Sequence, residues 1–261
     1  MVWVFSHNCI RYYCFTVTSI FSAAAHPERI RVVVVDQIVA DEDGSCDIPH
    51  SPCSQDPNQP ICLYKDQIDV YQMDAELAVG PVFARHIGYR LYRGEYYAMQ
   101  SDAHVTFTKG WDDDIISQIE ATGDEMAVLT TYLTDIVGSI DPITGLSLRR
   151  TRPIMCNTEY EGTGEGRHLR HLAQPEGMPD IHGMPQLQPY WAAGYSFSRG
   201  HFVATVPYDL YQVRHNRSSC TNIITDDSSK WSSTDFLCTI SANDLSGRRN
   251  VDRIKRFYCW L

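Results

Sequence analysis

Two residues near the middle of the chain are the first candidates for chemistry. Asp102 and His104 are separated by Ala103 and follow directly on the largely aromatic and apolar segment 96–100. Residues two apart in an extended backbone point to the same side, so this carboxylate and imidazole are placed to share one metal ion. Such a ligand pair suits manganese as well as magnesium. A triplet of this kind is also common in solvated loops, so its context has to decide between the two interpretations.

The segments around this triplet predict alternating strands and helices. A helix is expected after Gly80, because Pro81 suits the first helical turn, and another from Trp111, with Ile115 and Ile119 facing inward. Such alternation is typical of the α/β class, with an open, mainly parallel sheet flanked by helices and ligands at the carboxyl ends of its strands. Asp102 falls at such an end. The predicted strands are 30–35, 68–73, 96–100 and 127–132.

Composition limits the partners. The 261 residues, 43% of them hydrophobic, are enough for one large α/β domain. Lys and Arg total 22 against 32 Asp and Glu, and the formal charge of −10 would repel a nucleic-acid backbone. Nucleic acid is therefore not expected as a partner. A small phosphorylated substrate is still compatible with this charge, because a bound metal ion can reverse the local field.

The nine cysteines are an odd count with no Cys-x-x-Cys pair, so at least one thiol is expected to be free or intermolecular. Cys46, His50, Cys53 and Cys62 together suggest a zinc site. Their gaps are wider than the spacing of about two to four residues that structural zinc ligands usually have. A plain loop, disulfide-bonded if the compartment is oxidising, is the favoured interpretation.

The N-terminal segment has some features of a signal peptide. An apolar stretch over 14–21 precedes three alanines at 23–25, but no positively charged region comes before it. Polar residues such as Arg11 keep the apolar run well below the roughly 18 residues of a membrane span. We therefore expect no transmembrane helix and a cytoplasmic location, with the Golgi lumen as the alternative if an N-terminal anchor is missing.

The segment 93–107, followed by Gly110-Trp111-Asp112, resembles a family of eukaryotic enzymes. These are the protein N-acetylglucosaminyltransferases, of GT-A type, that modify hydroxyproline on the small adaptor subunit of cullin-based ubiquitin ligases. The resemblance covers roughly residues 22 to 210. Further blocks similar to the family occur in the same order at 66–68, 74–75, 80–85, 191–197 and 206–209.

The resemblance implies a GT-A-like fold and metal-dependent transfer of N-acetylglucosamine from UDP-GlcNAc to a protein hydroxyl, with retained configuration. Asp102 and His104 would bind the metal, Mn or Mg, and the diphosphate, and Asp102 would act in catalysis by stabilising the leaving group. Arg85 would approach the nucleotide phosphates, whereas an ordinary helix arginine forms a surface salt bridge. Trp191 would contact donor or acceptor, or else pack in the core. Asp209 is equally a pocket acid or a turn residue.

The catalytic core is expected over residues 22–212, because segments 1–21 and 213–261 do not match the family. The family begins with an apolar strand ending in a Ser-Tyr-Arg-Asp-like segment and later carries a Phe-x-Gly-Glu-Glu segment, and neither is found here. We therefore expect a core without its first strand, or with an improvised one, and low activity. Two alternatives are an inactive relative that binds nucleotide or a protein partner, and a glycosyltransferase acting on another acceptor.

Overall fold

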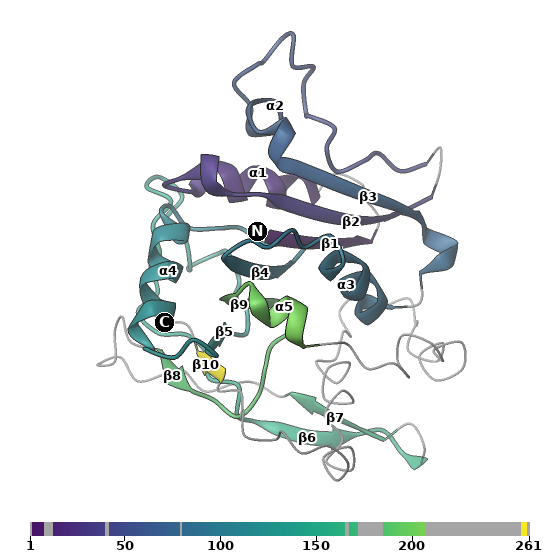
Figure 1. The fold of residues 1–261 in the computed structure, drawn as a ribbon. Helices are drawn as coiled ribbons and strands as arrows, with labels where there is room; N and C mark the ends of the chain where they lie inside the picture. The colour runs from purple at the N-terminus through teal and green to yellow at the C-terminus, as the bar shows by residue number, and fades with distance from the viewer. Residues whose placement is uncertain are drawn as a thin grey trace.

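The computed structural model describes residues 2–7, 13–39, 42–78, 80–164, 167–171, 185–206 and 257–259. Its centre is an eight-stranded sheet with the strand order β3-β2-β1-β4-β9-β5-β10-β8 (Figure 1). The predicted α/β class, with an open and mainly parallel sheet, is confirmed. The strands are β1 (Val2–His7), β2 (Val32–Ile38), β3 (Ile68–Asp74), β4 (Tyr97–Asp102), β5 (Val128–Thr130), β8 (Gln186–Leu187), β9 (Tyr195–Arg199) and β10 (Phe257–Cys259).

The first four strands of the chain are parallel neighbours, as β3–β2, β2–β1 and β1–β4, and β5–β10 is a fourth parallel pair. Strand β9 runs antiparallel to both β4 and β5, and β8 runs antiparallel to β10. Alternation of strands and helices did not predict this reversed strand. Because β4 and β5 are both antiparallel to β9, their carboxyl ends lie at the same edge of the sheet.

Helices cover both faces of the sheet. α1 (Tyr13–Ala23) and α4 (Trp111–Ala121) pack on one face, and α3 (Pro81–Tyr89) and α5 (His201–Thr205) lie on the other. The alternating side chains of β2 explain this, since Val32 and Val34 join the core with α1 and α4 whereas Val33 packs with Val203 of α5. All of these valines are fully buried except Val203, which is 9% exposed. A run buried on both faces is typical of an inner parallel strand.

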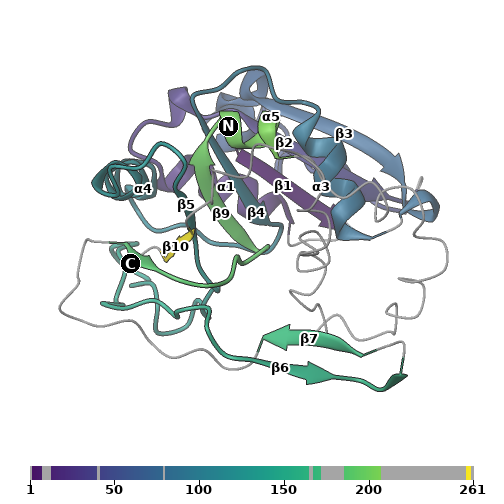
Figure 2. The same ribbon diagram turned by 60° about the horizontal axis from the view of Figure 1, so that its bottom comes forward.

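Smaller elements connect these layers. A short helix α2 (Pro60–Leu63) and three 3₁₀ turns, at Pro27–Arg29, Lys65–Gln67 and Ala75–Leu77, precede or follow the strands. Strands β6 (Thr158–Glu161) and β7 (His168–His171) form a separate two-stranded antiparallel ribbon, which projects away from the main sheet (Figure 2).

The N-terminal segment supplies a strand to the sheet, which is the second of the two alternatives that the sequence left open. β1 lies between β2 and β4, with Val2 paired to Val32 and to Met99, so the sheet does have a strand at this position. α1 adds Val17, Ile20 and Phe21 to the main core. The described residues before position 22 therefore form part of the same sheet and core. The departure of the first 21 residues from the family pattern stays a prediction.

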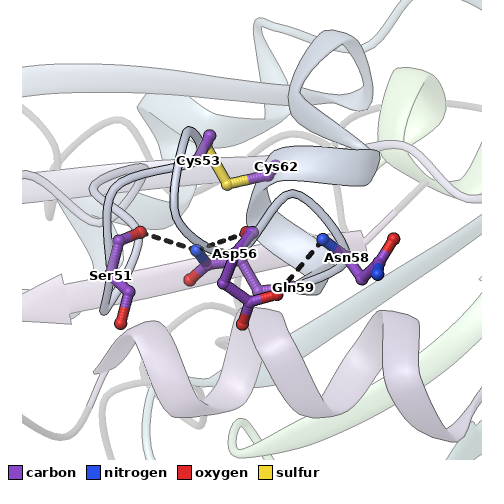
Figure 3. Close-up of a disulfide and its surroundings, with 6 residues drawn as sticks. All are labelled: Ser51, Cys53, Asp56, Asn58, Gln59 and Cys62. Atoms are coloured by element: carbon purple, nitrogen blue, oxygen red, sulfur yellow. Dashed lines mark hydrogen bonds between the residues drawn. A yellow bond between two sulfur atoms is a disulfide. The ribbon is translucent and has the colours of Figure 1, made fainter.

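The polar loop between β2 and β3 contains a disulfide. Cys53 and Cys62 are bonded, with their Cα atoms 5.7 Å apart (Figure 3). Within this loop the Gln59 amide donates to the carbonyls of Ser51 at 2.6 Å and of Asp56 at 2.9 Å. No three His, Cys, Asp or Glu side chains gather into a metal-binding group anywhere in the described ranges. The interpretation as a disulfide-bonded loop is confirmed.

At the amino edge of the sheet, charged side chains join three neighbouring segments. Arg31 contacts Asp69 of β3 at 2.6 Å and also pairs with Glu95 before β4. Burial raises the pKa of the Glu95 carboxyl, but hydrogen bonds from backbone N–H groups and from Arg31 outweigh it and lower that pKa overall. This network lies at the edge opposite Asp102, and we assign it a structural role.

Among the described residues, no helix is both long and apolar enough to cross a membrane. The predicted segment 213–261 lies outside the described residues apart from β10, and so does Asp209.

Candidate active site

The topology of the sheet marks one position on its carboxyl edge. From β1 the chain proceeds through β2 to β3 on one side, and then returns to place β4 on the other side of β1. In open α/β sheets, ligands bind outside the carboxyl ends of the strands at such a switch point. Asp102 is the last residue of β4, aligned with Phe5 of β1. The candidate metal ligand therefore lies at this switch point.

The spacing of residues on α3 and β4 brings Arg85 to Asp102. α3 runs back from the carboxyl edge, so it is antiparallel to β4, and the Tyr89 hydroxyl donates to the Gln100 side chain at 3.0 Å. Arg85 lies one turn before Tyr89, about 6 Å along the helix, and Asp102 lies two residues after Gln100, about 6.6 Å along the strand. These two distances are nearly equal, so Arg85 lies at the same level as Asp102. The nearest guanidinium nitrogen of Arg85 is 3.8 Å from Oδ1 of Asp102.

Arg85 is buried, unlike most helix arginines, which lie at the surface. Its side chain is 8% exposed, whereas that of Asp102 is 35% exposed. The Nε of Arg85 is buried and has no hydrogen-bond partner among the described residues. A buried guanidinium with an unused donor is costly unless a further acceptor completes its shell. The oxygens of an anionic ligand beside Asp102 would supply that acceptor.

The Asp102 carboxylate lies against Gly194, where a larger residue would collide with it. The Asp102 N–H donates to the Gly194 carbonyl at 2.9 Å, just before β9 begins. A Cβ on Gly194 would lie 2.8 Å from Oδ2 of Asp102, which is closer than any ordinary contact. The turn that carries Gly194 is itself fixed to β5, because the Thr130 hydroxyl accepts from Ala192 N at 2.9 Å and donates to the Tyr195 carbonyl at 2.8 Å.

With Asp102 as the metal ligand that the sequence resemblance implies, Gly194→Ala is expected to weaken Mn²⁺-dependent binding of UDP about tenfold with little loss of stability. The added methyl group displaces the Asp102 carboxylate, but this group ends a side chain that can rotate away, so the backbone need not move. Displacing a metal ligand through its neighbour typically costs about 10–100-fold in affinity. Titration calorimetry measures the affinity, with Gly44→Ala as the control, since its added Cβ would meet nothing closer than 3.9 Å. Undiminished affinity in Gly194→Ala would contradict the prediction.

His104 lies in the turn after β4 and is exposed, whereas Ala103 and Val105 on either side are buried. A partly exposed carboxylate and an exposed imidazole two residues apart form a donor set that suits a divalent ion. The described residues provide no third protein ligand. This fits an ion whose remaining ligands are phosphate oxygens and water, as is usual where Mg²⁺ or Mn²⁺ binds with a nucleotide.

Comparison with known families agrees with this geometry. The family model described as Glycosyltransferase (GlcNAc) matches residues 47–213, which is more than half of the chain and includes Arg85, Asp102, His104 and Gly194. The chain belongs to this family. No curated protein sequence matches it. The resemblance seen in the sequence is thus confirmed for the GlcNAc glycosyltransferase family as a whole, while the hydroxyproline-modifying subtype stays a prediction.

Two solved structures are similar to this GlcNAc-family chain. A crystal structure of GalNAc-T7 with UDP, GalNAc and Mn²⁺ is 15% identical, with 80% of this chain covered and a TM-score of 0.48. Residues 1–349 of S. aureus TarS, crystallised with UDP-GlcNAc, are 20% identical, with 54% of this chain covered and a TM-score of 0.37. In each case the chain spans 36% of the length of the solved protein.

Two further residues singled out in the sequence of this glycosyltransferase-family chain, Trp191 and Asp112, make structural contacts. Trp191 is 5% exposed and packs with Val128 and Phe202, so little of its indole face is accessible, and its role in binding stays a prediction. Asp112, in the first turn of α4, is buried and accepts from Ala25 N at 2.7 Å and His26 N at 2.8 Å. It therefore also fastens the end of α1.

Proposed function

We propose that this chain binds UDP-GlcNAc together with a divalent metal ion and transfers N-acetylglucosamine to a protein hydroxyl, with retained configuration. The observation that carries the proposal is the position of Asp102, at the carboxyl end of β4 and at the switch point of the sheet, 3.8 Å from the buried Arg85. Membership of the GlcNAc glycosyltransferase family supports it.

In this proposal Asp102 and His104 hold the metal ion, which when bound neutralises charge on the departing diphosphate. Arg85 adds a fixed positive charge beside the same phosphates, and its buried Nε donates to a phosphate oxygen. Because its guanidinium is already buried and ordered, little conformational entropy is lost when the donor binds. We assign no general base, since in a front-face reaction the leaving phosphate can take the acceptor proton.

A loop beside the site supports a protein acceptor. The 132–148 loop leaves the carboxyl end of β5, at the same edge as Asp102, and Leu133 in it would lie 3.7 Å from a Cβ on Gly194. Backbone hydrogen bonds order this loop, including Leu148 N to the Ser139 carbonyl at 2.9 Å. It nevertheless presents Val137 and Ile143 at 93% and 92% exposure. Ordered but exposed apolar side chains suit contact with a protein better than contact with a free sugar.

Replacing both Val137 and Ile143 by serine is expected to raise the KM for a protein acceptor about tenfold or more, with donor hydrolysis unchanged. Each aliphatic side chain contributes roughly 1.5–3 kcal/mol when fully buried against a partner. Steady-state kinetics with varied acceptor measures the effect. Leu63→Ser, at a 55% exposed position on α2, is the control. An unchanged KM in the double variant would remove the loop from the acceptor site.

The donor half of the proposal is tested by titrating UDP into the chain with and without Mn²⁺ and by assaying UDP-GlcNAc hydrolysis. We expect binding only with the metal ion, and faster hydrolysis of UDP-GlcNAc than of other UDP-sugars. Binding without any hydrolysis would favour the inactive relative. A panel of hydroxyproline peptides, serine peptides and free glycans then separates a protein acceptor from the other-acceptor alternative.

The compartment also belongs to the proposal. The sequence predicts a cytoplasmic location with the Golgi lumen as alternative, and the Cys53–Cys62 bond favours the second, because disulfides persist mainly in oxidising compartments.

A further inference from the structure

The turn that carries His104 is held by a helix far from it in the sequence. Thr16 of α1 is fully buried, and its hydroxyl donates to the carbonyl of Ala103 at 2.5 Å. The same oxygen accepts from the N–H of Val105 at 2.9 Å. A threonine hydroxyl has one proton to donate and two lone pairs, so one side chain can make both bonds. Together the two bonds bracket His104 on both sides.

These two bonds fix the backbone of the residue between them. The Ala103 carbonyl and the Val105 N–H belong to the peptide units on either side of His104, so holding both groups limits rotation at the His104 Cα. The His104 side chain is exposed, and its direction therefore depends mainly on this backbone. Asp102 is fixed separately, through the bond of its N–H to the Gly194 carbonyl.

Other contacts of α1 hold the same segment further along. Ser19 accepts from Phe107 N at 2.8 Å, and the Trp111 indole donates to the Ile20 carbonyl at 3.0 Å. These contacts fasten the chain between the turn and α4, whereas the Thr16 hydroxyl hydrogen-bonds to both neighbours of His104. A buried position that required only volume would be served by valine, which has nearly the shape of threonine and no hydroxyl to satisfy.

We propose that Thr16 is a positioning residue for the metal site, acting through the backbone of His104. The inference rests on the proposed function, since it takes His104 to be a metal ligand. It adds a residue that lies outside the 47–213 range matched by the family model. Without the Thr16 hydroxyl, the turn retains its side chains but no longer holds the imidazole at a fixed position relative to the Asp102 carboxylate.

The test compares Thr16→Val, Thr16→Ser and the control Thr18→Val, which removes a partly exposed hydroxyl from the same helix. The first readout needs no metal ion. Amide hydrogen exchange at Val105 in the metal-free protein is expected to be at least tenfold faster in Thr16→Val and unchanged in the other two. Thr16→Ala gives the same comparison if Thr16→Val does not fold.

The second readout is the affinity for Mn²⁺ in the presence of UDP, measured by the loss of the free Mn²⁺ paramagnetic resonance signal. We expect Thr16→Val to weaken it about 10–100-fold, as is typical when the support of a metal ligand is lost, and Thr16→Ser to restore it. Normal affinity in Thr16→Val, or normal exchange at Val105, overturns this inference alone. If the wild-type chain binds no Mn²⁺ with UDP, the proposed function falls as well.

Discussion

Asp102→Asn is expected to abolish Mn²⁺-dependent binding of UDP while the protein stays folded. Asparagine keeps the size of the side chain but removes the negative charge, and a neutral amide is a poor ligand for a divalent ion held by only one other protein side chain. Loss of a supporting residue typically costs about 10–100-fold in metal affinity, and loss of the carboxylate itself should cost more. Donor hydrolysis should fall below detection with the binding.

The fold should tolerate this change, although Arg85 loses the carboxylate that lies 3.8 Å away. Asp102 is 35% exposed, so water screens the pair, and a loss of stability within about 1 kcal/mol is expected. Titration calorimetry with Mn²⁺ and UDP checks the binding, and urea unfolding checks the fold. Asp66→Asn is the matched control, because Asp66 is exposed and precedes β3 at the opposite edge of the sheet. Wild-type affinity in Asp102→Asn would remove Asp102 from the metal site.

The position of Asp102 could be predicted from the sequence because it depends on local patterns. An apolar strand followed by polar residues fixes where a strand ends, and strand–helix alternation fixes which edge of a parallel sheet that end occupies. The nearness of Arg85 follows from the same reasoning once α3 is known to run antiparallel to β4. Its burial does not, since an arginine on a helix is ordinarily exposed in a surface salt bridge, whereas the structure buries Arg85 together with Val82, Ala84 and Gly88.

Other parts of the site depend on contacts between distant residues, which no local pattern reports. Thr16 and Val105 are 89 residues apart, and nothing in the apolar segment around Thr16 indicates that its hydroxyl holds a turn. The same holds for Gly194, because the need for glycine at this position comes from the Asp102 carboxylate, which leaves no room for a Cβ. Sequence patterning left open whether a strand forms before residue 22, for a related reason. A short apolar strand has no period of its own, so only its pairing with β2 and β4 reveals it.

Reversal of β9 has a consequence for the whole domain, because it brings Gly200 against the segment before β4. Gly200 follows the last residue of β9 and its N–H donates to the Tyr96 carbonyl at 2.8 Å. A Cβ on Gly200 would lie 1.9 Å from the backbone carbonyl oxygen of Glu95 and 2.4 Å from the Tyr92 hydroxyl. The φ angle of Gly200 is −60°, which any residue adopts, so the need for glycine here is one of space alone.

Gly200→Ala is therefore expected to destabilise the protein by about 3 kcal/mol or more, the upper range for forcing extra atoms into a packed region. The Tyr92 hydroxyl can move, but the Glu95 carbonyl belongs to the backbone that leads into β4, and its displacement would shift the pairing of β4 with β9. Urea unfolding measures the loss, and Gly44→Ala shows what the same substitution costs where the nearest atom is 3.9 Å away. Equal unfolding midpoints for the two variants would mean that β9 does not approach Glu95 this closely. Because Gly194 immediately precedes β9, residual folded Gly200→Ala protein should bind UDP and Mn²⁺ more weakly than Gly44→Ala.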